Sequence, residues 1–127
     1  DEPQLKLTDF DLSIESGGKR TRHRAGTEAY MAPEQLRGGC LLSPAADIFA
    51  FGVMAYNLVT RRMPLHGKTA KERRVRQVSR SYKLQPPQDL NSELSPKLGR
   101  VIMRCLEKDP NKRLPSMSYL CQELANI

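Results

Sequence analysis

The sequence predicts a mainly α-helical fold with one short strand near the N-terminus. Apolar and polar residues alternate only at residues 5–8, whereas helix-start signals precede several longer segments of helical periodicity, and residues 45–60 are apolar on nearly every side. The 127 residues match the usual length of about one domain. Contents of 39% hydrophobic and 28% charged residues indicate a folded globular segment.

The N-terminal region is expected to be a strand followed by a long loop. Residues 5–8, Leu-Lys-Leu-Thr, alternate as a half-buried strand does, and Asp9 follows them. Residues 13–26 are polar and basic and contain two adjacent glycines. A loop of this length usually has a function.

A central helix is predicted next. Ser43 and Pro44 form a helix start, with the serine as N-cap and the proline in the first turn. Because residues 45–60 are apolar all round, this helix is expected to lie in the middle of a larger body.

Three amphipathic helices complete the predicted fold. Thr69 and Glu72 form a capping box that opens a basic helix ending at about Arg80, and residues 84–94 are interpreted as a linker. Ser95 precedes the next helix and Pro115 begins the last one. The apolar stripes expected in the core are Leu98, Val101, Ile102, Cys105 and Leu106 on one helix, and Met117, Leu120, Cys121 and Leu124 on the other.

Composition excludes several classes of protein. The cysteines, Cys40, Cys105 and Cys121, have no C-x-x-C spacing, which argues against a disulfide framework and a zinc site and favours reduced core thiols in an intracellular (cytoplasmic) protein. No apolar run is long enough to span a bilayer, so no membrane partner is expected.

The chain is basic, with a formal net charge of +7. The positive residues cluster within residues 19–24 and 68–83, which favours encounters with anionic partners. Nucleic-acid binding is not favoured, because Tyr82 is the only aromatic residue in the second cluster and a stacking platform is therefore missing. A binding module for nucleic acid or an acidic protein stays open as an alternative, and steep salt dependence would support it.

Four motifs in register carry a resemblance to a known family. They are Asp-Phe-Asp at residues 9–11, Gly-Thr-Glu-Ala-Tyr-Met-Ala-Pro-Glu at 26–34, Asp-Ile-Phe-Ala-Phe-Gly at 47–52, and the segment 104–113 ending in Asn-Lys-Arg. Along the whole chain they resemble the eukaryotic-like (Hanks-type) Ser/Thr protein kinase domain, from the D-F-G position to the end. The resemblance implies a truncated helical lobe, with residues 1–34 as metal-binding and activation segment and 35–127 as helical subdomain.

The resemblance assigns roles at the first motif. Asp9 matches the aspartate that binds the Mg²⁺ on the ATP phosphates, and Phe10 matches the apolar plug that separates active from inactive states. Asp11 stands where the family usually has glycine. Aspartate tolerates left-handed backbone angles better than most residues, and the chain resembles active plant kinases with D-F-D. A pseudokinase or scaffold lobe that docks proteins remains the alternative.

The segment before Ala-Pro-Glu resembles the substrate-binding part of Ser/Thr kinases. Thr27 and Tyr30 match the Gly-Thr-x-x-Tyr pattern of that class, so protein substrates are expected at this region. Thr21, which lies between two arginines, is the first candidate phosphosite, and Ser16 is the second. A phosphate there would pair with nearby arginines and order the loop, and an unmodified solvated loop is the alternative.

Three further residues are expected to be structural anchors. Glu34 matches the glutamate that pairs with Arg113 in a buried ion pair, and Asp47 matches a buried aspartate that accepts N–H bonds from the catalytic loop. Phe49 and Ala50 replace the tryptophan and serine of the family motif and keep the site apolar or small.

Other parts of a kinase are missing from the sequence. The 127 residues contain no Gly-rich loop, no strand lysine and no catalytic loop with its base, and the absence of an initiator Met suggests a cut through a longer protein. The intact parent is expected to use ATP and Mg²⁺, and residues 1–127 alone to be inactive. Self-association is also expected, because apolar surface around Ile48, Phe51, Ala55 and Leu58 should lie bare.

Overall fold

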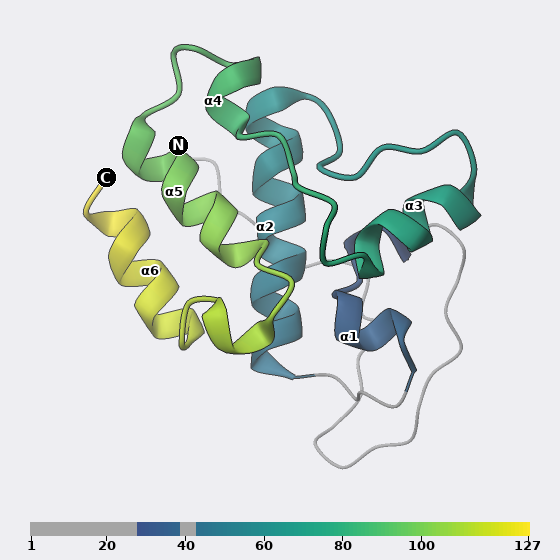
Figure 1. Ribbon diagram of the computed structural model, residues 1–127. Helices are drawn as coiled ribbons and strands as arrows, with labels where there is room; N and C mark the ends of the chain where they lie inside the picture. Colours follow the sequence, from purple (N-terminus) through teal and green to yellow (C-terminus); the bar gives the residue numbers. More distant parts are fainter. Residues whose placement is uncertain (1–27, 39–42) are drawn as a thin grey trace, which may run out of the picture.

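The computed structural model describes residues 28–38 and 43–127, and all regular secondary structure within these residues is helical (Figure 1). This confirms the mainly α fold class, while the strand expected at residues 5–8 lies outside the described residues. The elements are the short 3₁₀ helix η2 (Glu28–Tyr30), α1 (Pro33–Leu36), α2 (Pro44–Thr60), α3 (Ala70–Val78), α4 (Pro87–Leu90), α5 (Pro96–Cys105), the 3₁₀ helix η3 (Pro110–Lys112) and α6 (Met117–Ala125).

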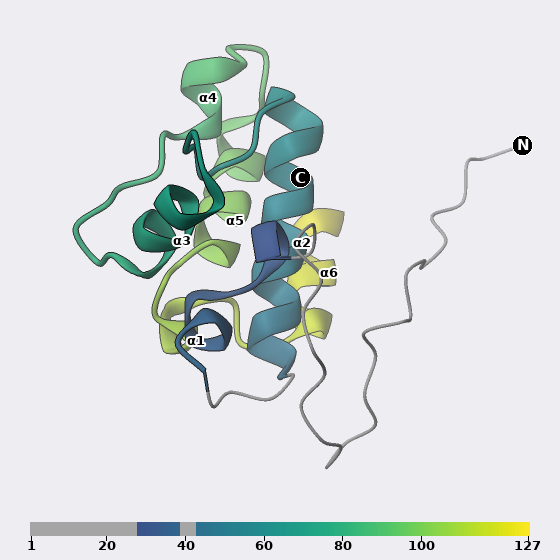
Figure 2. The same ribbon diagram turned by 90° about the vertical axis from the view of Figure 1, so that its right-hand side faces the viewer.

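Helix α2 lies at the centre of the molecule. In Figure 1 it runs vertically, with α5 and α6 on one side and α1 and α3 on the other, and the turned view of Figure 2 keeps α3 and α6 on opposite sides of it. Helix α2 packs against α5, α4, η2 and η3, and α1 packs against α3. The predicted central position of this helix is therefore confirmed.

Hydroxyl side chains begin the longer helices, as the sequence predicts for Ser43, Thr69 and Ser95. In each case the side-chain oxygen accepts the backbone N–H three residues later, at 3.1 to 3.4 Å. The last helix begins at Met117 and not at Pro115, because the hydroxyl of Ser116 accepts the N–H of residue 119 at 3.0 Å and makes Ser116 the N-cap.

The core forms between α2 and α5. Phe49, Val53 and Tyr56 of α2 are fully buried in one cluster with Ile102 and Leu106. A neighbouring cluster joins Ile48 to buried side chains of α5, α6 and the turn between them. Burying each such side chain contributes roughly 1.5–3 kcal/mol relative to leaving it in water.

Close approach of α2 and α5 requires a glycine. A Cβ atom added at Gly52 would lie 2.8 Å from the Cβ of Cys105 and 3.0 Å from the side chain of Leu106. Real Cβ atoms do not approach so closely, so the absence of a side chain at this position sets the distance between the two helices.

Two predictions about α3 and the following linker need correction. Helix α3 ends at Val78 rather than at about Arg80, because the amine of Lys108 binds the carbonyl oxygens of Arg76 and Ser79 and the chain becomes extended at Ser79. The segment 84–94 is not only a linker, since it contains α4. 

The capping box of α3 also differs from the prediction. Thr69 caps the helix as expected, but the carboxylate of Glu72 accepts the N–H of Lys68 at 2.8 Å instead of the N–H of Thr69. The carboxylate thus still satisfies a free donor before the helix, one residue earlier than in the standard motif.

The apolar stripe of α6 is less buried than the sequence predicts. Leu120 is 1% exposed and packs with Ile48 of α2 and buried residues of α5, but Met117 is 42% exposed and Cys121 is also exposed. Cys105 is buried as predicted, and this burial raises the pKa of its thiol to about 12. Cys40 lies outside the described residues.

The sequence predicts bare apolar surface on α2 around four residues. The structure contradicts this for Ile48 and Ala55 and confirms it for Leu58. Ile48 and Ala55 are buried, because residues of α5, α6 and the following turns cover them. Leu58 is 69% exposed, Met54 is exposed beside it, and Phe51 is half-buried.

Candidate functional site

The structure describes part of the predicted site. Tyr30, Glu34, Asp47 and Arg113 lie within the described residues. The other predicted site residues lie outside them, and these are Asp9, Phe10, Asp11, Ser16, Thr21 and Thr27.

Local hydrogen bonding places Glu34 in the first turn of α1. Ala32 precedes the helix in an extended conformation, Pro33 occupies the first helical position, and both are buried. The side chain of Gln35 accepts the N–H of Ala32 at 2.9 Å. Proline fixes its own φ near the helical value, which helps to hold the turn that carries Glu34, and the Glu34 carboxylate meets Arg113.

Glu34 and Arg113 form a bidentate ion pair. Nη1 of Arg113 donates to Oε1 of Glu34 at 2.6 Å, and Nη2 donates to Oε2 at 2.8 Å. The arginine side chain is 0% exposed and the glutamate side chain 15% exposed. The contact predicted from the sequence is confirmed, across a separation of 79 positions.

The remaining donors of Arg113 join the pair to two other segments. Nη1 also donates to the carbonyl of Ala45 at 3.0 Å, and Nε donates to the carbonyl of Glu107 at 2.7 Å. The guanidinium carbon lies 5.0 Å from the centre of the Phe49 ring. The buried cation is therefore satisfied on every side, and it connects α1, the start of α2 and the turn after α5.

The contact between Arg113 and Phe49 was missed at the level of sequence. The signal that could have found it is the aromatic residue kept at the position where the family has tryptophan. An aromatic face beside a guanidinium is attractive, so phenylalanine retains part of what the larger ring would supply.

Glu34 is held in its ionised form. Burial by itself raises the pKa of this carboxyl, but the hydrogen bonds and the positive charge of Arg113 outweigh burial and lower the pKa below its ordinary value of 4.5. The pair therefore stays fully charged at neutral pH.

Asp47 differs from the prediction that it is buried. It lies in the first turn of α2 with an exposed side chain, and no hydrogen bond among residues 28–38 and 43–127 ends on its carboxylate. The family partner of this aspartate is a catalytic loop, and the sequence contains none. Partial burial without such a partner raises the pKa of Asp47.

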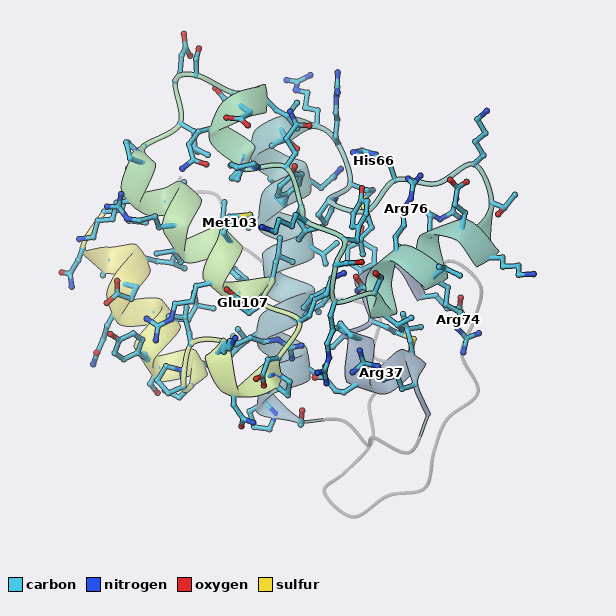
Figure 3. The ribbon with its side chains drawn as sticks, in the orientation of Figure 1. Arg37, His66, Arg74, Arg76, Met103 and Glu107 are labelled. Atoms are coloured by element: carbon cyan, nitrogen blue, oxygen red, sulfur yellow. The ribbon has the colours of Figure 1, made fainter. Side chains whose placement is uncertain are left out.

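A small hollow of about 50 Å³ lies where η2 and α1 meet α3. Gln77 donates to the carbonyl of Met31 at 2.7 Å and Arg74 donates to the carbonyl of Leu36 at 3.0 Å, so α3 is fastened to the segment around α1. Figure 3 shows Arg74 on α3 close to α1. Tyr30, at the end of η2, is 41% exposed.

The contribution of α3 to this region was also missed. The basic residues within 68–83 indicated only encounters with anionic partners, whereas two polar side chains of α3, Arg74 and Gln77, bind backbone carbonyls of the segment 31–36. The alternation of charged residues along α3 carries no sign of these partners, which lie about 40 positions earlier in the chain.

Residues 28–38 and 43–127 hold no group of three His, Cys, Asp or Glu side chains suited to a metal ion. In the same part of the chain, no helix combines the length and the apolar character that crossing a membrane requires.

A central apolar helix with a buried arginine–glutamate pair at its start is the arrangement of a protein kinase helical lobe. The twitchin kinase region from C. elegans is similar in fold to this chain, with a TM-score of 0.64 and 25% identity over 80% of this chain and 17% of that one. The chain belongs to the protein kinase domain family, whose model matches residues 1–125.

Relatives in this family are serine/threonine kinases. A probable serine/threonine-protein kinase of Clostridium acetobutylicum is 29% identical over 130 aligned positions, which cover 100% of this chain and 19% of that protein. The serine/threonine-protein kinase PkaA of Streptomyces coelicolor is 37% identical over 121 positions, 93% of this chain and 21% of that protein. The chain therefore spans about one fifth of the length of these relatives.

Proposed function

We propose that residues 1–127 are the C-terminal lobe of a Ser/Thr protein kinase that transfers the γ-phosphate of ATP to Ser or Thr hydroxyls of proteins. The observation that carries the proposal is the bidentate Glu34–Arg113 pair, since it ties the Ala-Pro-Glu segment to the body of the lobe. Residues 1–34 act as the metal-binding and activation segment, and residues 35–127 as the helical subdomain.

The roles of the other site residues follow from the family. Asp9 is the residue that would hold Mg²⁺ with ATP in the intact kinase, and Phe10 would pack behind it. Thr27 and Tyr30 belong to the surface that receives the substrate, as the Gly-Thr-x-x-Tyr pattern of Ser/Thr kinases implies. Phosphorylation at Thr21 or Ser16 would order the activation segment.

The chain alone is proposed to lack phosphotransfer. Its sequence holds no Gly-rich loop, no strand lysine and no catalytic base, and a single metal-binding aspartate does not position ATP. Protein substrates would still meet the lobe at its activation segment and helices. The intracellular location stays a prediction.

Phosphotransfer assays on the whole reading frame and on residues 1–127 test the proposal. With Mg²⁺, ATP and a generic basic protein, we expect phosphoserine and phosphothreonine from the whole protein and no turnover above a blank from residues 1–127. Turnover by residues 1–127 in kinase-free preparations would contradict their inactivity. Phosphotyrosine as the product would contradict the substrate class.

Asp11 keeps the pseudokinase alternative open, because it stands where the D-F-G motif of the family has glycine. If the whole protein has the catalytic-loop aspartate and the strand lysine but transfers no phosphate, replacing Asp11 by Gly shows whether this residue is the cause. Restored activity would assign the loss to Asp11, and continued inactivity would favour a protein-docking role.

A further inference from the structure

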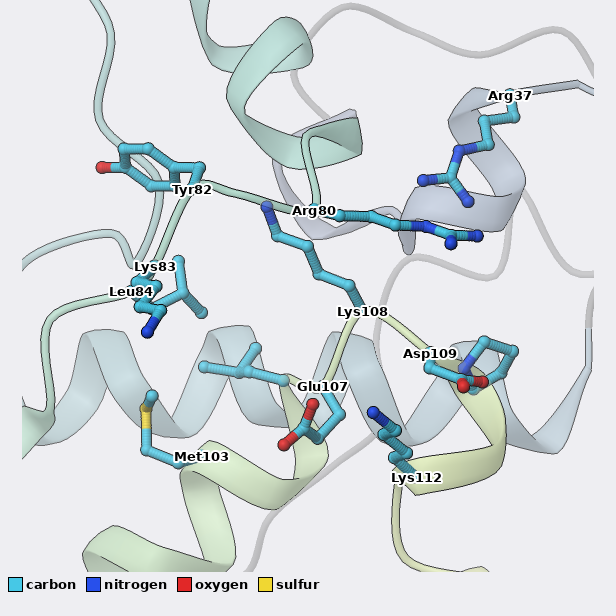
Figure 4. A pocket seen from close by; sticks show the side chains of 12 residues that line it. Arg37, Arg80, Tyr82, Lys83, Leu84, Met103, Glu107, Lys108, Asp109 and Lys112 are labelled. Carbon is cyan, nitrogen blue, oxygen red and sulfur yellow. The ribbon is translucent and has the colours of Figure 1, made fainter.

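A basic cavity lies on the side of the molecule where α1, the segment after α3 and the turn after α5 meet (Figure 4). Its volume is about 610 Å³. The positive side chains that line it come from three separate segments, and they are Arg37, Arg80, Lys83, Lys108 and Lys112.

Negative side chains only partly balance this basic cavity. Glu107 and Asp109 also line it, and the carboxylate of Asp109 already accepts the N–H of Asn111 at 2.9 Å. Within residues 28–38 and 43–127, the ion pairs join Glu34 to Arg113 and Glu72 to Arg76, and none of the five lining cations takes part. The cavity is therefore left with a surplus of positive charge.

Two of the cations are fixed in place by the backbone. Arg37 donates to the carbonyl of Val78 at 2.9 Å, and the amine of Lys108 binds the carbonyls of Arg76 and Ser79. These bonds hold the walls together without neutralising either charge. Such pre-positioned donors lose less conformational entropy on binding an anion than free surface side chains do.

The remaining geometry brings the positive groups toward one another. In Figure 4 the guanidinium groups of Arg37 and Arg80 lie near each other, while the amine of Lys108 points to the side of Tyr82. Burial and then the nearby charge of Arg37 lower the pKa of Lys108, as expected for a cation held near another cation. An anion bound in the cavity would reduce the repulsion between Arg37 and Lys108.

The apolar part of the lining indicates what else the ligand contains. Leu84 and Met103 lie beside the cations, and Tyr82 forms the adjoining wall with its ring 5.4 Å from the amine of Lys108. A bare phosphate ion fills only a small fraction of this volume. A single tyrosine also gives no succession of aromatic faces for the bases of a nucleic acid.

We propose that the basic cavity binds a phosphorylated segment of a partner protein. The phosphoryl group lies between Arg37 and Arg80, whose guanidinium groups can each donate two parallel hydrogen bonds, and Lys108 adds positive charge to the same cavity. An apolar side chain next to the phosphorylated residue packs on Leu84 and Met103. Binding at this cavity does not depend on phosphotransfer by the protein.

Peptide binding to residues 1–127 tests the proposal directly. The probes are three fluorescent pools of short peptides with randomised flanks around a central phosphothreonine, glutamate or threonine. Arg80→Glu and Lys83→Glu are the test variants, because both side chains are exposed and line the cavity. Lys71→Glu is the matched control, since it makes the same charge change on the exposed surface of α3 outside the cavity.

We expect the phosphothreonine pool to bind most tightly. Arg80→Glu should weaken its binding roughly tenfold or more, as for loss of a charge-assisted hydrogen bond. Lys83→Glu should weaken it less, because Lys83 adds positive charge to the cavity without bonding the phosphoryl group. Lys71→Glu should bind as the unaltered chain does, with circular dichroism confirming equal helicity of all variants. Equal binding of the threonine pool, an equal loss in Lys71→Glu, or tighter binding of a single-stranded oligonucleotide would overturn the proposal.

Discussion

Glu34 and Asp47 are carboxylates in the first turns of neighbouring helices, yet their surroundings shift their pKa values in opposite directions. Arg113 lowers the pKa of Glu34 through two hydrogen bonds and its charge, against the effect of burial. Partial burial raises the pKa of Asp47. Position at a helix N-terminus favours an anion in both cases, so the difference comes from the partner.

The comparison extends to the two sides of α2. On one side, Arg113 contacts Ala45 and Phe49 and satisfies the start of the helix. On the other side, a stripe at helical spacing runs from Asp47 through Phe51 and Met54 to Leu58, with a half-buried phenylalanine between exposed neighbours. One face of α2 is thus covered by contacts with Arg113. The face with Asp47, Met54 and Leu58 exposes a charged side chain next to apolar ones.

Removing Arg113 should have the largest effect. Arg113→Ala leaves Glu34 without its partner and should lower the free energy of unfolding by roughly 3–5 kcal/mol. Arg113→Lys should recover only part of this loss, because an amine cannot form the two parallel bonds. Urea unfolding followed by circular dichroism measures both.

Arg104→Ala is the control for Arg113→Ala. Its guanidinium lies 5.8 Å from the ring of Tyr119 on the exposed side of α5, and its loss should change stability by less than about 1 kcal/mol. Equal losses in the two alanine variants would show that the buried pair has no special contribution.

The second prediction concerns the closed side of α2. Gly52→Ala should destabilise the lobe by roughly 1–3 kcal/mol, because the new Cβ would overlap the side chains of Cys105 and Leu106. Alanine at an open helical position would instead add stability relative to glycine. A higher midpoint of thermal unfolding would therefore show that α2 and α5 are not held in close contact.

Much of this fold could be predicted because its signals are local. Ser43, Thr69 and Ser95 mark helix starts through bonds to residues three positions away, and periodicity identifies the core stripe of α5. The end of α3 could not be predicted in this way. It depends on Lys108, which lies about 30 positions further along the chain and binds the last carbonyls of the helix.

For the candidate site, too, what could be predicted depends on whether the sequence carries a signal for the contact. The Glu34–Arg113 contact was predicted because motif resemblance supplies a distant partner that periodicity does not. The same resemblance made Asp47 appear buried, since it carries over an environment that includes segments not present in this sequence. The basic cavity has no motif at all, because its cations come together only through the packing of α1, α3 and η3.

The opposite pKa directions of the two carboxyls predict how stability changes with pH. The contribution of Glu34 should be fully present above its ordinary pKa of 4.5 and should be lost as pH falls through its lowered folded-state pKa. Asp47 binds a proton more tightly in the folded state, so its contribution should decline as pH rises through its ordinary value of 3.8 toward its raised pKa.

Two substitutions separate these contributions. Glu34→Gln should reduce the loss of folding stability that occurs as pH falls below 4.5. Asp47→Asn should remove the opposite effect, which is the loss of stability as pH rises from 3.8 toward the raised pKa of Asp47. Carboxyl titration by nuclear magnetic resonance reports both groups directly. A Glu34 pKa at or above the ordinary value would contradict the ion pair as the source of the shift.

The smallest effect on stability, and the clearest effect on assembly, is expected on the open side of α2. We propose that copies of residues 1–127 associate through the exposed apolar residues Met54 and Leu58. Burying such a patch in an interface removes apolar surface from water. Leu58→Ser removes a side chain that is 69% exposed, so the free energy of unfolding should change by less than about 0.5 kcal/mol. Sedimentation at several concentrations should show less association. Met117→Ser on α6, also at an exposed apolar residue, should leave association unchanged. A monomeric unaltered chain with a sharp cooperative melt would refute the proposal and show that this face of α2 is stable in water.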